Sequence, residues 1–162
     1  KGGAAASPVS KEHMGMALNW LKQENAERYT LSAEGTGIVA FPQRYTDELV
    51  AMRQHLKVIQ AGVLTGEVKG RDLTPAHALA MSATLLRQDA FDTEEVSYEQ
   101  AIAYLRKEAI ALSETAPRGY ILLTYWKIPL GFVKNIGNRA NNLYPQEWRI
   151  RSGYLPEEIR TL

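Results

Sequence analysis

The pattern of apolar residues changes at Pro117 and Gly119, and this change most limits the folds open to the chain. Before it, apolar residues recur three and four positions apart in several short segments, which is typical of helices with one buried face. After it, they form short continuous runs, from Tyr120 to Tyr125 and from Leu130 to Lys134, which are typical of strands. Helices followed by a small antiparallel sheet predict the α+β class.

Helix-start signals divide the residues before Pro117 into separate segments. Thr46 followed by two acidic residues indicates one helix start, and Thr74 followed by Pro75 indicates another. Ser97 and Gln100 have the spacing of a capping box. The expected buried positions of the four helices are Met14, Leu18 and Leu21; Leu49, Met52 and Leu56; Leu79, Ala83 and Leu86; and Ile102, Leu105, Ala109 and Leu112.

Further short strands are expected at 38–41, 58–62, 143–145 and 148–151. We expect residues 1–10, which are rich in glycine, alanine and serine, to form a linker. Residues 11–62 are expected to form a small α+β unit and residues 63–151 a second unit that ends in the sheet. Residues 152–162 would then be a C-terminal tail. Because neither unit has much apolar surface of its own, the two are expected to pack together.

The composition excludes several kinds of site. Cysteine is absent from the 162 residues, so the chain has no disulfide, no thiolate metal site and no cysteine nucleophile, which fits a cytoplasmic protein. Its apolar runs are too short to cross a bilayer, so no membrane contact is expected. The three histidines, His13, His55 and His77, lack a second ligand at metal spacing, and ordinary packing is the favoured interpretation.

Positive charge gathers in the C-terminal third. Residues 118–151 carry six basic residues against the single acid Glu147, a net charge of +5, whereas the whole chain carries +1 and the remainder therefore −4. Such asymmetry is typical of a localised contact with a polyanion, or of an ordinary solvated strand face. Aromatic residues interleave with the basic ones and could stack on unpaired bases, but Tyr120 and Phe132 are expected in the core of the sheet.

Three motifs in this third resemble a known family. They are GYILLTY at 119–125, PLGFVK at 129–134 and NLYP at 142–145. They are similar to the PUA-like RNA-binding domain that ends bacterial methyltransferases of the 16S rRNA methyltransferase F type, within the NOL1/NOP2/Sun group of S-adenosylmethionine (SAM)-dependent RNA cytosine-5 methyltransferases. The similarity extends upstream through 99–106, 74–80 and 61–67, and residues 20–41 resemble the family's smaller intermediate domain.

The resemblance implies a fold and a role. Residues 11–62 would be the intermediate domain, and residues 63–151 a PUA-like pseudo-barrel with flanking helices. The family's catalytic cysteines and glycine-rich SAM site have no counterpart here, so the chain is expected to be a non-catalytic region, cut away from a catalytic domain, that holds no cofactor itself. Its partners would be structured RNA, with rRNA favoured and tRNA as the alternative, and its own N-terminal catalytic domain, with no DNA. The rival interpretation is a protein-docking module that contacts the catalytic domain or a ribosomal protein.

The charged segment and the resemblance together predict an RNA-binding face. Two positions depart from the family, because Asn141 and Gln146 stand where lysine is usual, and both changes remove positive charge. The expected RNA-binding residues are Lys127, Lys134, Arg139, Asn141, Asn142, Tyr144, Arg149 and Arg151.

Overall fold

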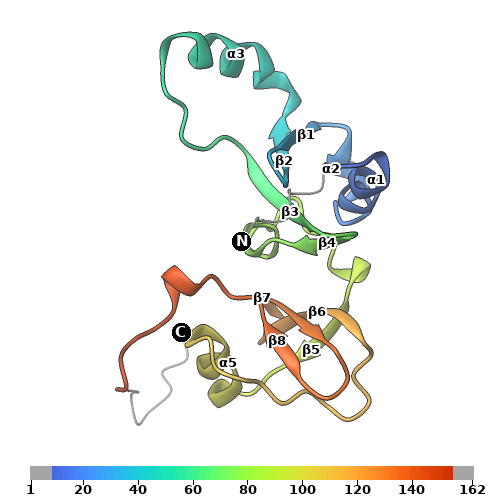
Figure 1. Cartoon of the computed structure of the whole chain (residues 1–162), viewed down its shortest axis with the longest axis vertical. Helices are drawn as coiled ribbons and strands as arrows, with labels where there is room; N and C mark the ends of the chain where they lie inside the picture. The colour runs from blue at the N-terminus through green and yellow to red at the C-terminus, as the bar shows by residue number, and fades with distance from the viewer. Residues whose placement is uncertain (1–8, 155–162) are drawn as a thin grey trace, which may run out of the picture.

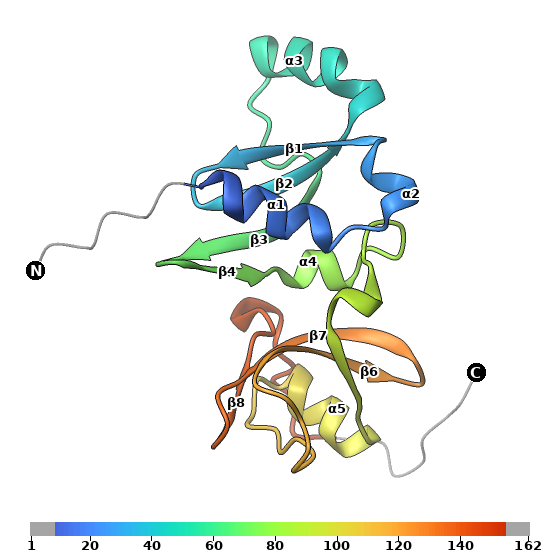
Figure 2. The same cartoon turned by 90° about the vertical axis from the view of Figure 1, so that its right-hand side faces the viewer.

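A computed structural model describes residues 9–154 and confirms the α+β class with two packed subdomains (Figure 1). Two four-stranded sheets lie one above the other along the long axis, and a single helix, α5, lies beneath the second sheet (Figure 2). No helix of the described part has the length and apolar character needed to span a membrane.

The first subdomain is an antiparallel sheet with helices at its face and edges. Its strand order is β1-β2-β3-β4, with β1 at Tyr29–Glu34, β2 at Gly37–Pro42, β3 at Val63–Lys69 and β4 at Asp72–Pro75. Its helical segments are α1 (Lys11–Asn19), α2 (Gln23–Ala26), η1 (Gln43–Tyr45), α3 (Thr46–His55) and α4 (His77–Ala80). The helix α1 begins with a capping box, in which Ser10 Oγ accepts from the backbone N–H of His13 and His13 Nδ1 accepts from that of Ser10.

The second subdomain is a mixed sheet. Its order is β5-β6-β7-β8, with β5 at Asp92–Glu95, β6 at Gly119–Tyr125, β7 at Ile128–Asn135 and β8 at Ala140–Asn142. The pair β5–β6 is parallel and the others are antiparallel, so the crossover between β5 and β6 carries α5 (Tyr98–Leu105). Two short helices, η2 (Gln88–Ala90) and η3 (Gln146–Trp148), flank the sheet. Within the described strands β5 and β8 remain edges, so the expected pseudo-barrel is an open sheet here.

The β6–β7 hairpin joins the two subdomains, because both of its faces are buried. Leu122 and Phe132 point into the core of the first subdomain and have 0% and 1% of their surface exposed. Ile121 and Val133, on the opposite face, pack against Tyr104 of α5. Side chains alternate between the faces of a strand, so one hairpin can contribute side chains to two hydrophobic cores. The expected packing of the two subdomains is therefore confirmed.

Strand pairing places the boundary between the two sheets after residue 62, where the first unit was expected to end. The strand β3 pairs with β2 and β4 pairs with β3, so the first sheet runs on to Pro75, and the second begins at Asp92. Gly62 lies in the connection between α3 and β3, at a φ of 80°. The short apolar run near it gave no signal of the antiparallel pairing that follows. The expected linker and tail lie largely outside the described residues.

Several expected elements are confirmed. The strands β2, β6 and β7 and the start of α3 lie where the sequence predicts them. The capping box of α5 is present in full, because Ser97 Oγ accepts from the N–H of Gln100 and the Gln100 side chain accepts from the N–H of Ser97.

Other expectations are wrong, for local reasons. Leu18 is 47% exposed, because α1 turns His13 and Ala17 inward instead. Thr74 and Pro75 end an edge strand rather than begin a long helix. Proline lacks a backbone N–H, and it is tolerated there because no further strand needs a donor at that edge. The segment 58–62 forms no strand, and Ile59 is 93% exposed.

The remaining corrections concern the C-terminal strands and three helix faces. The chain forms β8 at 140–142 and η3 at 146–148 rather than strands at 143–145 and 148–151. Met52, Leu56, Ala83 and Ala109, expected to be buried, are exposed. The helices α4 and α5 end sooner than their apolar periodicity suggests.

Candidate nucleic-acid interface

The eight expected RNA-binding residues do not gather on a single surface. Lys127 lies in the turn of the β6–β7 hairpin, whereas Lys134 lies near the far end of β7. Lys134 is seven positions after Lys127, which corresponds to about 23 Å of extended strand. The structure therefore divides the expected basic face into separate positions with different surroundings.

The turn that holds Lys127 is unusual. Trp126 and Lys127 both have positive φ, at 51° and 61°, in a two-residue turn that normally favours asparagine and glycine. The Glu95 carboxylate accepts hydrogen bonds from the Thr124 hydroxyl at 2.5 Å and from the Lys127 N–H at 3.3 Å. These hydrogen bonds, that of Thr124 first, hold the pKa of Glu95 below its ordinary value. The backbone of Lys127 is thus held by an acidic side chain.

Lys134 links the two sheets. Its ammonium group forms an ion pair with Asp72 of β4 and lies 3.4 Å from the Tyr120 hydroxyl, which also donates to Asp72 at 2.8 Å. The hydrogen bond to Asp72 raises the pKa of Lys134. Burial alone would raise the pKa of Asp72, but the hydrogen bonds from Lys134 and Tyr120 lower it. With 37% of its side chain exposed and a carboxylate already paired, Lys134 has little capacity left for a phosphate.

The amide of Asn142 is occupied by the fold. Asn142 Nδ2 donates to the carbonyl oxygens of Tyr104 and Glu108 at 2.9 and 3.0 Å, at the C-terminal end of α5, and Oδ1 accepts from the N–H of Tyr144 at 2.9 Å. Unpaired carbonyls at a helix end need such donors. Asn141 pairs with Lys134 across β7 and β8 and is half-buried.

Tyr144 packs in an aromatic cluster at the junction of the subdomains. Its ring meets His77 of α4 edge-on, with 4.9 Å between ring centroids, and Tyr104 at 5.4 Å. The exposed ring of Trp148 also lies against His77, at 5.5 Å. Burial lowers the pKa of His77, and its Nδ1 is buried with no protein partner. The cluster therefore favours neutral His77.

We expect stability to fall in mild acid because of His77. A histidine whose pKa is lowered in the folded state takes up a proton more readily when unfolded, so stability is lost as the pH falls below the ordinary pKa of 6.5. About 1.4 kcal/mol is the upper limit of this loss between pH 7.5 and 5.5, and solvent screening at the half-buried His77 keeps the expected loss below it. Urea unfolding at both pH values should show a smaller difference for His77→Gln than for the wild type. The matched control is His55→Gln, at an exposed position on α3, and an equal effect of both substitutions would contradict the assignment.

Arg139 lies in the loop between β7 and β8. It is exposed, and it lines a shallow hollow whose opposite wall is residues 109–114 and includes Glu114. Arg118 lies near the same loop, because a Cβ on Gly137 would stand 2.7 Å from its guanidinium group. Arg118 and Arg139 are thus two exposed cations at this end of the sheet.

Three arginines meet at the C-terminal end of α5. Arg106, Arg149 and Arg151 line a hollow of about 370 Å³ together with one acid, Glu108. We call this site the arginine hollow. It brings together two of the residues expected from the sequence and adds Arg106, which the charge count missed because it lies outside the basic segment. Arg106 is the C-cap residue of α5, and a cation beside the C-terminal end of a helix is favoured.

Backbone contacts fix the arginine hollow. The N–H of Ile150 donates to the Leu105 carbonyl at 2.9 Å, and Arg106 Nη2 donates to the Ser152 carbonyl at 2.8 Å. These bonds hold the segment 149–153 against the helix end. Arg106 Nε is buried without a protein partner, and Arg149 and Arg151 are exposed. Guanidinium groups bind phosphate through paired N–H donors, so the hollow has the chemistry of a phosphate site.

One comparison with known families bears on this part of the chain. Residues 92–150 match the family model of the methyltransferase RsmF PUA domain, which is 59 of the 162 residues. The match begins at the first residue of β5 and ends within the segment that lines the arginine hollow. No curated protein matches the chain. Residues 92–150 therefore form a PUA-domain region of the methyltransferase type, as the resemblance implied.

Proposed function

We propose that the chain is the RNA-binding, substrate-positioning region of a SAM-dependent RNA cytosine-5 methyltransferase, with rRNA as its first candidate substrate. The observation that carries the proposal is the arginine hollow at the end of the matched PUA region. In this proposal SAM and the catalytic cysteines belong to the neighbouring catalytic domain. This chain binds the RNA at a distance from the reacting cytosine.

The chemistry of the hollow favours backbone contact over base reading. Arginine contacts to phosphate fix the register and orientation of a nucleic acid but carry no sequence information. A region that positions a substrate for another domain needs this kind of contact. The paired state of Lys134 limits the number of available cations, so the affinity of the chain alone is expected to be modest and steeply dependent on salt.

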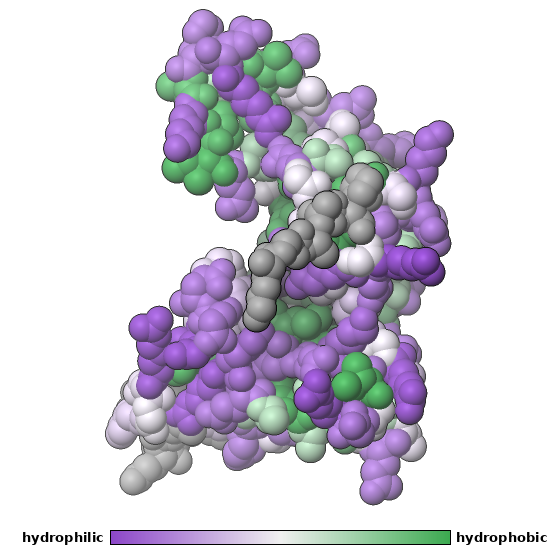
Figure 3. Space-filling model, viewed as in Figure 1, coloured by the Kyte–Doolittle hydropathy of each residue, from purple (hydrophilic) through white to green (hydrophobic). Residues whose placement is uncertain are grey.

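A second candidate function has its own observation. Apolar side chains of α3 and its flanks are exposed, and Figure 3 shows them as a cluster at the end of the molecule farthest from the PUA region. They are Tyr45, Val50, Met52, Leu56 and Ile59. Exposed apolar patches mark protein contacts, and the proposed occupant is the catalytic domain or a ribosomal protein. The two functions use separate surfaces and are compatible.

The test of the RNA proposal is salt-dependent binding. Fluorescence anisotropy with a labelled rRNA hairpin should give a slope of log affinity against log salt of about −2 to −3.5 for the wild type. The variant Arg149→Ala/Arg151→Ala should weaken binding and reduce the size of the slope by about 2. The control Lys11→Ala/Lys57→Ala removes the same charge from exposed positions far from the hollow along the chain. Equal slopes in both variants would contradict the proposal and favour the docking function.

A further inference from the structure

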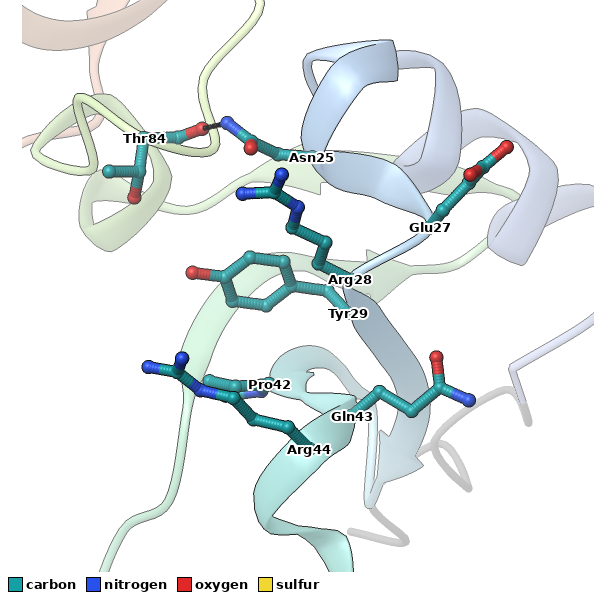
Figure 4. Close-up of a pocket in the computed structure, with 8 residues that line it drawn as sticks. All are labelled: Asn25, Glu27, Arg28, Tyr29, Pro42, Gln43, Arg44 and Thr84. Carbon is teal, nitrogen blue, oxygen red and sulfur yellow. Dashed lines mark hydrogen bonds between the residues drawn. The ribbon is translucent and has the colours of Figure 1, made fainter.

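A second cationic pocket lies in the first subdomain, outside the PUA region. It has a volume of about 630 Å³, within the range of small-ligand sites. Arg28, Tyr29 and Arg44 line it, and Asn25 and Thr84 form part of its wall (Figure 4). We call it the Arg28–Arg44 pocket. The acidic balance of this part of the chain gave no sign of it.

Strand pairing builds the pocket. Tyr29 and Pro42 are partners at the end of the β1–β2 pair, so the residues just before and just after them come side by side. The N–H of Gln43 donates to the Arg28 carbonyl at 2.8 Å and closes this end of the pair. Asn25 Nδ2 donates to the Thr84 carbonyl at 2.7 Å, which ties α2 to the loop after α4. The two arginines are therefore held on one rigid frame.

The side chains present positive charge on both sides of an aromatic ring. In Figure 4, Arg28, Tyr29 and Arg44 point to the same side, with the Tyr29 ring between the two guanidinium groups, and Glu27 points away. Neither arginine forms an ion pair with any residue that the structure describes. Arg44 lies 4.5 Å from the centroid of the exposed Tyr45 ring. Two unpaired cations flanking an aromatic surface suit a ligand that is both anionic and planar.

We propose that the Arg28–Arg44 pocket binds an unpaired nucleotide of the RNA, with the guanidinium groups on its phosphates and the base against Tyr29. The identity of the ligand rests on the proposed function, whereas the pocket itself is a separate site on the other subdomain. Guanidinium groups neutralise phosphates, and aromatic faces stack on bases without regard to sequence. The chain would then hold RNA at two places, one on each sheet.

The test measures the binding of a labelled hexauridylate and separates the contribution of the two arginine charges from that of the Tyr29 ring. Single-stranded RNA changes the salt slope by about 0.7 for each phosphate contact, so Arg28→Ala/Arg44→Ala should reduce it by about 1.4. Tyr29→Leu keeps an apolar side chain against the core but removes the ring, and should weaken binding about fivefold or more with the slope unchanged. The control Lys11→Ala/Lys57→Ala should change affinity much less than either. Because Arg28 and Arg44 are exposed, their variant tests the proposal even if Tyr29→Leu does not fold.

The outcomes separate this inference from the proposed function. If Arg28→Ala/Arg44→Ala behaves like the lysine control while Arg149→Ala/Arg151→Ala loses binding to the hairpin, the pocket is overturned and the proposed interface stands. If Arg149→Ala/Arg151→Ala behaves like the lysine control while Arg28→Ala/Arg44→Ala loses binding, the arginine hollow is overturned and the pocket is supported. If the wild-type chain binds neither RNA, both are overturned.

Discussion

Gly131→Ala should destabilise the protein by about 3 to 4 kcal/mol, a large effect for the addition of one methyl group. Gly131 lies in β7 at a φ of 143°, a conformation that side chains strain to adopt. A Cβ there would stand 2.1 Å from the Tyr104 hydroxyl and 2.8 Å from His77 Nδ1. Tyr104 is fully buried and its hydroxyl donates to the Phe132 carbonyl at 3.2 Å, so it has no room to withdraw.

Gly119→Ala is the matched control for this substitution. Gly119 lies in β6 of the same sheet at a φ of 122°, but a Cβ there meets nothing within 4 Å. Only the backbone cost of about 1 to 2 kcal/mol is therefore expected. Urea unfolding of both variants isolates the steric part as their difference, about 2 kcal/mol. Equal losses would show that Tyr104 and His77 pack more loosely around Gly131 than the structure has them.

Phe132→Ala should cost about 3 to 5 kcal/mol and should loosen both subdomains together. Phe132 belongs to the second sheet, but its ring is buried in the core of the first subdomain, with 4.7 Å between its centroid and that of Phe91. Removing it leaves a cavity where the subdomains meet. Amide hydrogen exchange should show faster exchange in β2 as well as in β6 and β7, because Ile38 and Ala40 share that core.

Ile128→Ala is the control on the same strand, since its side chain is 66% exposed, and it should change stability by no more than about 0.5 kcal/mol. If Phe132→Ala speeds exchange only in the second sheet, the two subdomains fold independently and the shared core contributes little.

The sequence predicts elements whose signals are local. The hairpin β6–β7 follows from two apolar runs separated by the short turn segment 126–129, and α5 begins where Ser97 and Gln100 form their capping box. The strand β5 has no such signal, because Asp92–Glu95 is acidic and becomes a strand only by pairing in parallel with β6. The strand β1 was missed for a similar reason, since four of its six residues are exposed.

The candidate site is also predicted only where its signals are local in the sequence. Counting charge along the chain placed Arg149 and Arg151 in the same basic segment as Lys134, and it treated Lys134 as a free charge. The partner of Lys134 is Asp72, 62 residues earlier and on the other sheet. Arg28, Arg44 and Arg106 escaped the count because they lie outside the basic segment 118–151. Sites assembled from distant residues become visible only when strand pairing is known.

Crosslinking tests the central claim, that RNA lies against the arginine hollow, most directly. Trp148 and Tyr154 flank the hollow-lining segment in sequence and are 58% and 80% exposed, so RNA held there would lie close to aromatic rings. Ultraviolet irradiation of the chain with a 4-thiouridine-substituted rRNA hairpin, followed by peptide mapping, should place crosslinks in residues 148–154. Arg149→Ala/Arg151→Ala should lose them. Crosslinks confined to α3, or equal in the wild type and the variant, would contradict the account.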